Sequence, residues 1–296
     1  MNYLKYTLAL FLSTSLLPAF AQDEADKILA EAEHKEKSLT IATFKTTRVV
    51  NFHTIETCGP RTLDVRISHR FGDINSGTYD MFGLDGGATI RIGLEYSYDG
   101  RLMVGLGRSN YEKMFDGFAK YRVLRQTEDG SMPLSLTWFS GMYYTGIKDP
   151  GKSLTGYDKY QKGYQRLSYV HQAILGRKFG KNFSLQIAPW FVHYNMVNDI
   201  KDGNDMYGLA GAIRYKFTRS LAVTAEYATR FNKYSDNDYY DSFGIGFEIE
   251  TGGHVFQVHV TNSFGLSENQ FLPYTTTKWG DGGIRIGFNI SRVFTI

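Results

Sequence analysis

Cysteine is almost absent from this chain of 296 residues, and after the first 21 residues so are long apolar runs. Cys58 is the single cysteine, which excludes an intramolecular disulfide framework and a cysteine metal cluster. No later stretch reaches about 18 unbroken apolar residues, so the sequence predicts no helical membrane span. A length of 296 residues allows one large β domain or two small ones, and the chain contains only 6 Pro but 31 Gly.

Strong net charge and catalytic motifs are missing as well. The formal net charge is +3, which gives no case for nucleic acid as a partner. The sequence contains no Gly-x-Ser-x-Gly element and no His-Glu-x-x-His. We therefore predict no catalytic residue, no metal ligand and no cofactor.

Aromatic residues are abundant, with 21 Tyr and 21 Phe. This is more than a core needs, and rings at the two interfaces of a membrane would explain the surplus. Residues 1–21 predict a secretory signal, with Lys5 before an apolar core and Ala19-Phe20-Ala21 at the cleavage site. We expect export to the outer membrane of a Gram-negative cell. Residues 22–60 would then form an N-terminal periplasmic segment or a plug inside a lumen.

Residues 282–296 alternate between apolar and polar side chains along most of their length. Ile284, Ile286, Phe288 and Ile290 fall on one face, with Arg285 and other polar residues on the other face. A membrane barrel closes on such a strand, which pairs back with the first strand. We expect this strand to be recognised by the barrel-assembly machinery and its apolar face to contact outer-membrane lipid.

Twelve segments have the length that a tilted membrane strand needs. They are residues 62–71, 88–98, 102–109, 115–125, 134–145, 166–178, 183–197, 206–217, 221–231, 242–250, 254–262 and 282–296. The predicted fold is all-β, a closed antiparallel up-and-down transmembrane barrel of about 12 strands formed by residues 61–296.

Short and long connections alternate along the chain, which is typical of transmembrane barrels. Tight turns at 99–101, 180–182, 218–220 and 252–253 have hairpin length and composition. The Gly252-Gly253 turn predicts that Ile249 lies opposite Phe256 and Phe247 opposite Val258, all facing outward. A soluble sandwich would also alternate in polarity, but it does not explain the alternating connection lengths or the aromatic belts.

Two features of the strand at 183–197 and its neighbour conflict with the pattern. Pro189 removes a ladder donor in mid-strand, which predicts a bulge. His171 and His193 fall on the lipid face in the simplest register, and a bulge would move them inward.

Five segments resemble an uncharacterised family, a domain-of-unknown-function family of outer-membrane β-barrels from Bacteroidota-type bacteria. They are Phe44–Asn51 (FKTTRVVN), Leu63–Gly72 (LDVRISHRFG), Gly107–Lys113 (GRSNYEK), Glu250–Ser263 (ETGGHVFQVHVTNS) and Trp279–Phe294, which begins with WGDG and ends with NISRVF. The likeness runs from about Phe44 to the C-terminal end. The resemblance implies an outer-membrane barrel and no particular activity.

Charged side chains gather on the predicted inner face, and we take them as lumen-lining residues. They are Arg66, Arg70, Arg91, Glu95, Lys120, Arg122, Arg214, Glu226, Arg230, Glu248, His259 and Arg285. Charges in a narrow lumen must be paired or hydrated. The layout predicts that Arg66, Arg91, Arg122 and Arg214 face Glu95, Glu226 and Glu248.

Three functions fit this lumen. A narrow channel or transporter for a small solute is the first, and a structural or interaction barrel with a filled lumen is the second. The third is an outer-membrane hydrolase of lipid or lipopolysaccharide, for which His259, Thr261 and Glu248 lie near one another on adjacent predicted strands. The long loops at 146–165 and 263–281 are the expected ligand contacts.

Overall fold

A computed structural model describes residues 38–149, 151, 159–197, 202–233 and 239–296 of the protein. The predicted signal at residues 1–21 lies outside these residues, as does the first part of the predicted N-terminal segment. Within the described ranges, no helix is both long enough and apolar enough to cross a membrane.

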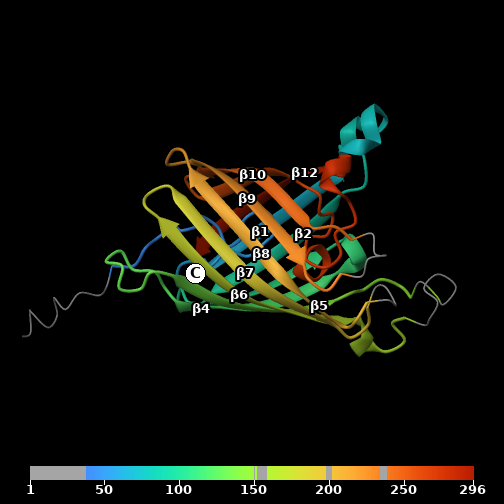
Figure 1. Ribbon diagram of the computed structural model, residues 1–296, viewed down its shortest axis with the longest axis horizontal. Coiled ribbons are helices and arrows are strands. Elements are labelled where there is room, and N and C mark those ends of the chain that lie inside the picture. Colours follow the sequence, from blue (N-terminus) through green and yellow to red (C-terminus); the bar gives the residue numbers. More distant parts are fainter. Residues whose placement is uncertain (1–37, 150, 152–158, 198–201, 234–238) are drawn as a thin grey trace, which may run out of the picture.

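Twelve antiparallel strands close into a barrel, with each strand paired to its neighbours in the chain and β1 paired to β12 (Figure 1). The strands are β1 (Thr62–Asp73), β2 (Thr89–Ser97), β3 (Leu102–Ser109), β4 (Phe115–Leu124), β5 (Ser135–Tyr144), β6 (Leu167–Phe179), β7 (Phe183–Tyr194), β8 (Asp205–Lys216), β9 (Leu221–Arg230), β10 (Ser242–Thr251), β11 (His254–Thr261) and β12 (Arg285–Thr295). The predicted fold class and all twelve strands are confirmed. The seventh strand ends three residues earlier than predicted, and the last begins three residues later.

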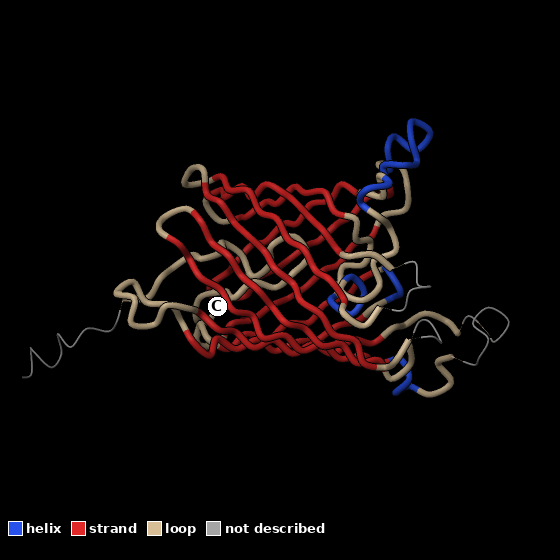
Figure 2. Tube along the Cα trace, in the orientation of Figure 1, coloured by secondary structure: helices blue, strands red, loops and turns tan. Residues whose placement is uncertain are grey.

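Short helices occupy the connections between strands. They are η1 (Ile74–Gly83), η2 (Tyr111–Lys113), η3 (Gly163–Arg166), α3 (Glu268–Phe271) and η4 (Trp279–Asp281). The barrel has two different ends (Figure 2). We call the end that carries the tight turns, Thr62 and Thr295 the turn end, and the end that carries the long connections the loop end.

Burial in this barrel is the reverse of burial in a water-soluble sandwich. Along β2, Thr89, Arg91 and Glu95 are buried, whereas Ile92 and Leu94 between them are exposed. The contrast is large, because Glu95 is 0% exposed and Ile92 is 55% exposed. An apolar exterior around a polar interior is the arrangement that a hydrocarbon surrounding requires.

The register of the strands agrees with the predicted turns. Ile249 lies opposite Phe256 and Phe247 opposite Val258, as the two-residue turn requires. At the seam, β1 and β12 pair without interruption from Thr62↔Thr295 to Arg70↔Gly287. The C-terminal strand therefore closes the barrel, as its sequence predicted.

The predicted bulge at Pro189 is wrong. The pairs Gln172↔Trp190 and Leu175↔Ile187 keep the same register on both sides of this proline. Pro189 points outward opposite Leu209. Register shifts occur elsewhere, between Arg70 and Asp73 and between Arg122 and Leu124.

The two histidines on either side of this proline stay on the outer face, and each has a polar partner. His171 Nδ1 lies 2.9 Å from Ser140 Oγ on the neighbouring strand. His193 Nδ1 lies 2.6 Å from a carboxylate oxygen of Asp205. These local partners reduce the cost of placing a polar ring on the outer surface.

Ile245 provides a test of the outward face. A charge at this position would be placed in hydrocarbon, so Ile245→Lys is expected to destabilise the folded barrel by about 2–4 kcal/mol. The control Ile245→Val keeps the apolar character and should change stability little. Urea unfolding in lipid vesicles measures both, and equal stability of the two variants would contradict the face assignment.

Candidate functional site

The segment from Phe44 to Glu56, here called the plug segment, lies inside the barrel. It has no regular secondary structure and folds back on itself at Val50 and Asn51. Val49 N donates to Phe52 O at 2.8 Å, which closes the turn. The segment therefore enters the lumen from the turn end and returns there to join β1 (Figure 1).

The tip of the plug segment is held by one carboxylate. Glu226 on β9 accepts hydrogen bonds from the backbone N–H groups of Val50, Asn51 and Phe52, at 2.9, 2.8 and 3.2 Å. Asn51 Nδ2 adds a fourth donor at 2.7 Å. Three successive amides around one carboxylate make charge-assisted bonds, which are stronger than bonds between neutral groups.

Other backbone groups of the plug segment are paired with side chains of the barrel wall. Lys120 Nζ donates to the carbonyl oxygens of Thr47 and Glu56. Further donors from the wall are Arg70 and Asn289 to Val50 O, Thr137 to Ile55 O, Gln186 to His53 O and Gln257 to Arg48 O. A buried irregular backbone is stable only when its polar groups find such partners.

A second segment enters the lumen from the loop end. Residues 262–284 between β11 and β12, here called the inward loop, carry the short helix α3. Leu266, Glu268 and Phe271 are each less than 5% exposed. Asn269 Nδ2 donates to Ser168 Oγ at 2.9 Å, which ties the helix to β6.

The plug segment and the inward loop meet inside the barrel. Arg48 Nη1 lies 2.6 Å from Glu268 Oε1, and both side chains are buried. The rings of Phe52 and Phe271 stack with centroids 5.2 Å apart. Tyr143 on β5 also donates to Glu268, at 2.6 Å. An ion pair and a ring stack therefore connect two segments that are not part of the wall.

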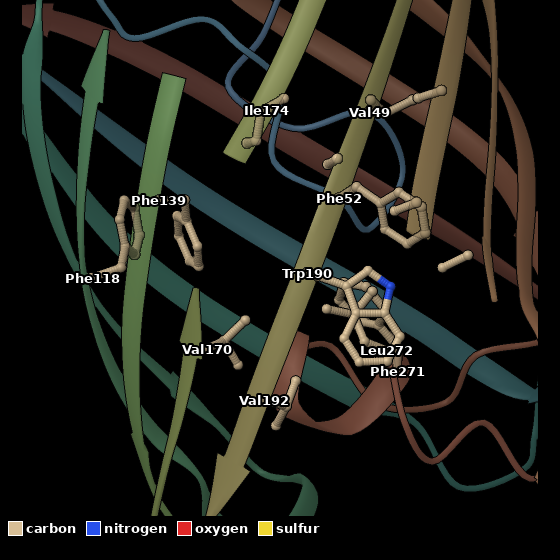
Figure 3. Close-up of a cluster of buried hydrophobic side chains, with 14 of the residues drawn as sticks. Val49, Phe52, Phe118, Phe139, Val170, Ile174, Trp190, Val192, Phe271 and Leu272 are labelled. Carbon is tan, nitrogen blue, oxygen red and sulfur yellow. The ribbon is translucent and has the colours of Figure 1, made fainter. Parts of the chain in front are cut away.

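One side of the inner wall is apolar and receives the plug segment (Figure 3). The inward residues of β6 and β7 include Val170, Ile174, Trp190 and Val192, each 3% exposed or less. Ile55 of the plug segment belongs to the same buried cluster. The inward faces of β6 and β7 mix these apolar side chains with polar ones such as Gln172 and Gln186, so the alternation of polarity is weak and sequence reasoning missed this inner surface.

All twelve side chains taken from the sequence as lumen-lining are buried in the structure. Each is 8% exposed or less: Arg66, Arg70, Arg91, Glu95, Lys120, Arg122, Arg214, Glu226, Arg230, Glu248, His259 and Arg285. Many of them contact the plug segment or each other rather than an open bore. The lumen is therefore an occupied interior in this structure.

Of the four arginines in the predicted layout, Arg66 and Arg214 contact a predicted glutamate, whereas Arg91 and Arg122 pair elsewhere. Arg66 pairs with Asp64 at 3.0 Å and also lies 4.0 Å from Glu95. Arg91 pairs with Asp116, and Arg122 pairs with Glu56 of the plug segment. The remaining pairs are Arg214–Glu248, Arg230–Asp202 and Arg285–Asp73. Of the predicted pairings, Arg214 with Glu248 has the shortest contact, at 2.7 Å.

The residues considered for hydrolysis do not form a reactive arrangement. Glu248 is paired with Arg214, and Thr261 Oγ1 donates to Phe243 O at 2.8 Å. Neither ring nitrogen of His259 has a hydrogen-bond partner among the described residues. Within the same ranges, no three His, Cys, Asp or Glu residues are grouped to hold a metal ion.

Cavities lie at both ends of the filled lumen. The turn-end cavity of about 390 Å³ is lined by Lys45, Cys58, Asp64 and Glu250, among others. The loop-end cavity of about 170 Å³ lies beside α3. The plug segment and the inward loop meet between these two ends.

A closed ring of strands, an apolar exterior and an occupied polar lumen define a membrane β-barrel. The family model described as membrane bound beta barrel domain (DUF5777) matches residues 44–294, so the chain belongs to this family. The predicted likeness to an uncharacterised barrel family is confirmed to this extent, and the Bacteroidota-type origin stays a prediction.

No curated protein matches the chain. Among solved structures, the NanC porin has a TM-score of 0.48 and 9% identity, covering 79% of this chain and 99% of that chain. An outer membrane channel from Pseudomonas putida F1 has a TM-score of 0.45 and 14% identity, covering 81% and 98%. Outer membrane phospholipase A from Escherichia coli has a TM-score of 0.41 and 13% identity, covering 78% and 92%. At such low identity, the family and not these structures defines the class.

Glu226 offers a test of how the plug segment is held. Glu226→Gln removes the charge that three buried amides share and is expected to lower stability by about 2–3 kcal/mol. It should also expose the plug segment to proteolysis. Thr224→Ala, on the same face of β9, is the control and should leave protease resistance unchanged. A Glu226→Gln barrel as resistant as the wild type would show that this carboxylate does not hold the tip.

Cys58 gives a measure of burial at the turn end. Burial, together with the nearby carboxylates of Asp64 and Glu95, raises the pKa of the Cys58 thiol to about 12. Against an ordinary thiol, this lowers the reactive thiolate fraction at neutral pH roughly a thousandfold. Maleimide labelling should therefore be slow and rise about tenfold per pH unit between roughly pH 7 and pH 10. The boiled chain in detergent is the control, and its labelling rate should level off near pH 9, as for an ordinary thiol. A labelling rate of the folded protein that also levels off near pH 9 would contradict the raised pKa.

Proposed function

We propose that this protein is a narrow channel for small solutes in the outer membrane of a Gram-negative cell, closed in the arrangement described here. The observation that carries the proposal is the contact of Arg48 with Glu268, which joins the plug segment to the inward loop. Both segments can move without breaking any hydrogen bond between wall strands. The wall is therefore a fixed frame, and the two segments are the gate.

The chemistry of the wall supports a hydrated pathway once the gate opens. The wall faces that surround the plug segment carry charged residues such as Lys120, Arg70 and Glu226. Water and solute can replace the backbone groups that these side chains now bind. Charged rings of both signs give a pore a preference among ions rather than recognition of one molecule.

A structural or interaction barrel with a permanently filled lumen is the second candidate. The apolar cluster between the plug segment and strands β4–β7 favours it, because burying Phe44, Phe52 and Ile55 stabilises the closed arrangement. This candidate differs from the first only in whether the gate opens. The hydrolase has less support, because Glu248 and Thr261 are engaged elsewhere and the His259 ring has no hydrogen-bond partner in the described part of the chain.

The external contacts belong to the same proposal. The exposed apolar side chains of the strands would contact outer-membrane lipid. β12, which closes the barrel at the seam with β1, would present the signal for the barrel-assembly machinery. Nucleic acid has no place in this function.

Conductance across planar bilayers tests the gate. Arg48→Gln removes the charge that binds Glu268 and is expected to increase the open probability, and deletion of residues 41–59 should increase the single-channel conductance. The control Lys45→Gln removes an ion pair with Glu250 at the turn end, where both side chains are about one-third exposed, and should leave gating unchanged.

Absence of conductance in the wild type, Arg48→Gln and the deletion variant would contradict transport and favour the filled-lumen candidate. An equal effect of Lys45→Gln and Arg48→Gln would show that the contact with Glu268 is not the gate.

A further inference from the structure

The loop-end cavity has a composition that the channel itself does not explain. It lies between η2 and the inward loop and is lined by Tyr111, Glu112, Phe264, Gln270, Phe271 and Tyr274, among others. The ring of Tyr111 meets that of Phe264 edge to face, with centroids 5.0 Å apart at 77°. Tyr274 is held in the same way by Tyr239, at 4.9 Å. The aromatic walls are therefore fixed by their own contacts rather than by a ligand.

Glu112 brings one carboxylate to this aromatic cavity. Its backbone φ is 50° and that of Lys113 is 49°, a left-handed conformation that non-glycine residues rarely adopt. The conformation is held by Gly146 N and Thr145 Oγ1, which both donate to Glu112 O. Strained backbone of this kind is typical of sites where a side chain must be placed in one position.

The Glu112 side chain is half-buried, and its hydrogen-bond partner in the inward loop is a neutral group. Gln270 Nε2 donates to Glu112 Oε2 at 3.0 Å, and an amide carries no charge. Burial raises the pKa of the Glu112 carboxyl, and Gln270 and Lys159 offset only part of that effect. Of the described residues that line the cavity, none is Lys or Arg. The lining therefore carries one formal negative charge among aromatic rings.

Aromatic rings in this region already bind a cation. The guanidinium of Arg285 lies over the ring of Phe264, 4.9 Å from its centroid, while Arg285 also pairs with Asp73. The faces of Tyr and Phe rings attract ammonium groups, and several such rings around one site select quaternary ammonium ligands.

We propose that the loop-end cavity binds a small organic cation, an alkylated ammonium compound, that arrives from the side of the long loops. The rings of Tyr111, Phe271 and Tyr274 would surround the alkyl groups, and Glu112 would balance the charge. A neutral molecule of the same shape would occupy the space between the rings but would add no charge to balance the carboxylate beyond what Lys159 and Gln270 already supply.

The same helix that borders the cavity also forms the gate. Gln270 and Phe271 line the cavity, while Glu268 on the same α3 contacts Arg48 of the plug segment. The cavity is formed only while α3 lies in the lumen. A ligand bound between η2 and α3 therefore stabilises this closed arrangement over an open one. The cation is therefore an inhibitor of opening. This coupling rests on the proposed channel function, whereas the binding itself does not.

Calorimetric titration of the full-length protein in detergent micelles tests the binding. Choline and tetramethylammonium are the cationic probes, and 3,3-dimethylbutanol is the neutral molecule with the shape of choline. We expect choline to bind at least tenfold more tightly than the neutral alcohol. Glu112→Gln should remove this preference, while Glu128→Gln, at the turn end, should keep it.

Failure of both cations to bind the wild type at millimolar concentration overturns the site. Equal affinity for choline and the neutral alcohol also overturns it, and this comparison does not depend on the folding of any variant. The coupling is measured separately in planar bilayers with Arg48→Gln, where choline on the loop side should reduce the open probability. Binding without any change in conductance would overturn the coupling and leave the site standing.

Discussion

A backbone without regular secondary structure can be buried only if its amide and carbonyl groups find partners, and this constraint shapes the whole lumen. Hydrogen bonds within the plug segment, such as Thr54 N to Thr47 O and Thr54 Oγ1 to Thr46 O, satisfy part of its backbone. The wall supplies further partners, through Glu226 at the tip and Lys120 along the side. The inward charges of β4 and β9 thus bind specific backbone groups of the plug segment. A barrel with the same strands but other lumen side chains would leave those backbone groups without partners.

The balance of charge inside the barrel follows from the same constraint. Arg66, Arg91 and Arg214 each lie within 3.0 Å of a carboxylate, because an isolated charge in this interior would be costly. The plug segment completes the balance by bringing Glu56 to Arg122 and Arg48 to Glu268. The wall and the two inserted segments therefore form one electrostatic unit.

The sequence predicts the wall well and its contents poorly. Alternation along β2 and β10, together with turn length, determines which side chains face lipid and how strands pair, because both are local properties. The inner surface of β6 and β7 could not be predicted in this way, since apolar residues such as Ile174 and Trp190 stand among its polar residues and weaken the period-2 signal. The partner of Arg122 is Glu56, 66 positions earlier in an irregular segment, and no periodicity connects the two. The position of Glu268 in the lumen depends on the path of a long loop, for which the sequence has no repeating pattern.

The two segments that fill the lumen are attached to the two strands that form the seam. The plug segment leads into β1, and the inward loop leads into β12. Each filler is therefore continuous with one of the two edge strands that must meet to close the barrel. The plug segment joins the seam at Thr62, at the turn end, and the inward loop joins it at Arg285, at the loop end. Pairing of β1 with β12 thus fixes the attachment points of both fillers at opposite ends of one seam.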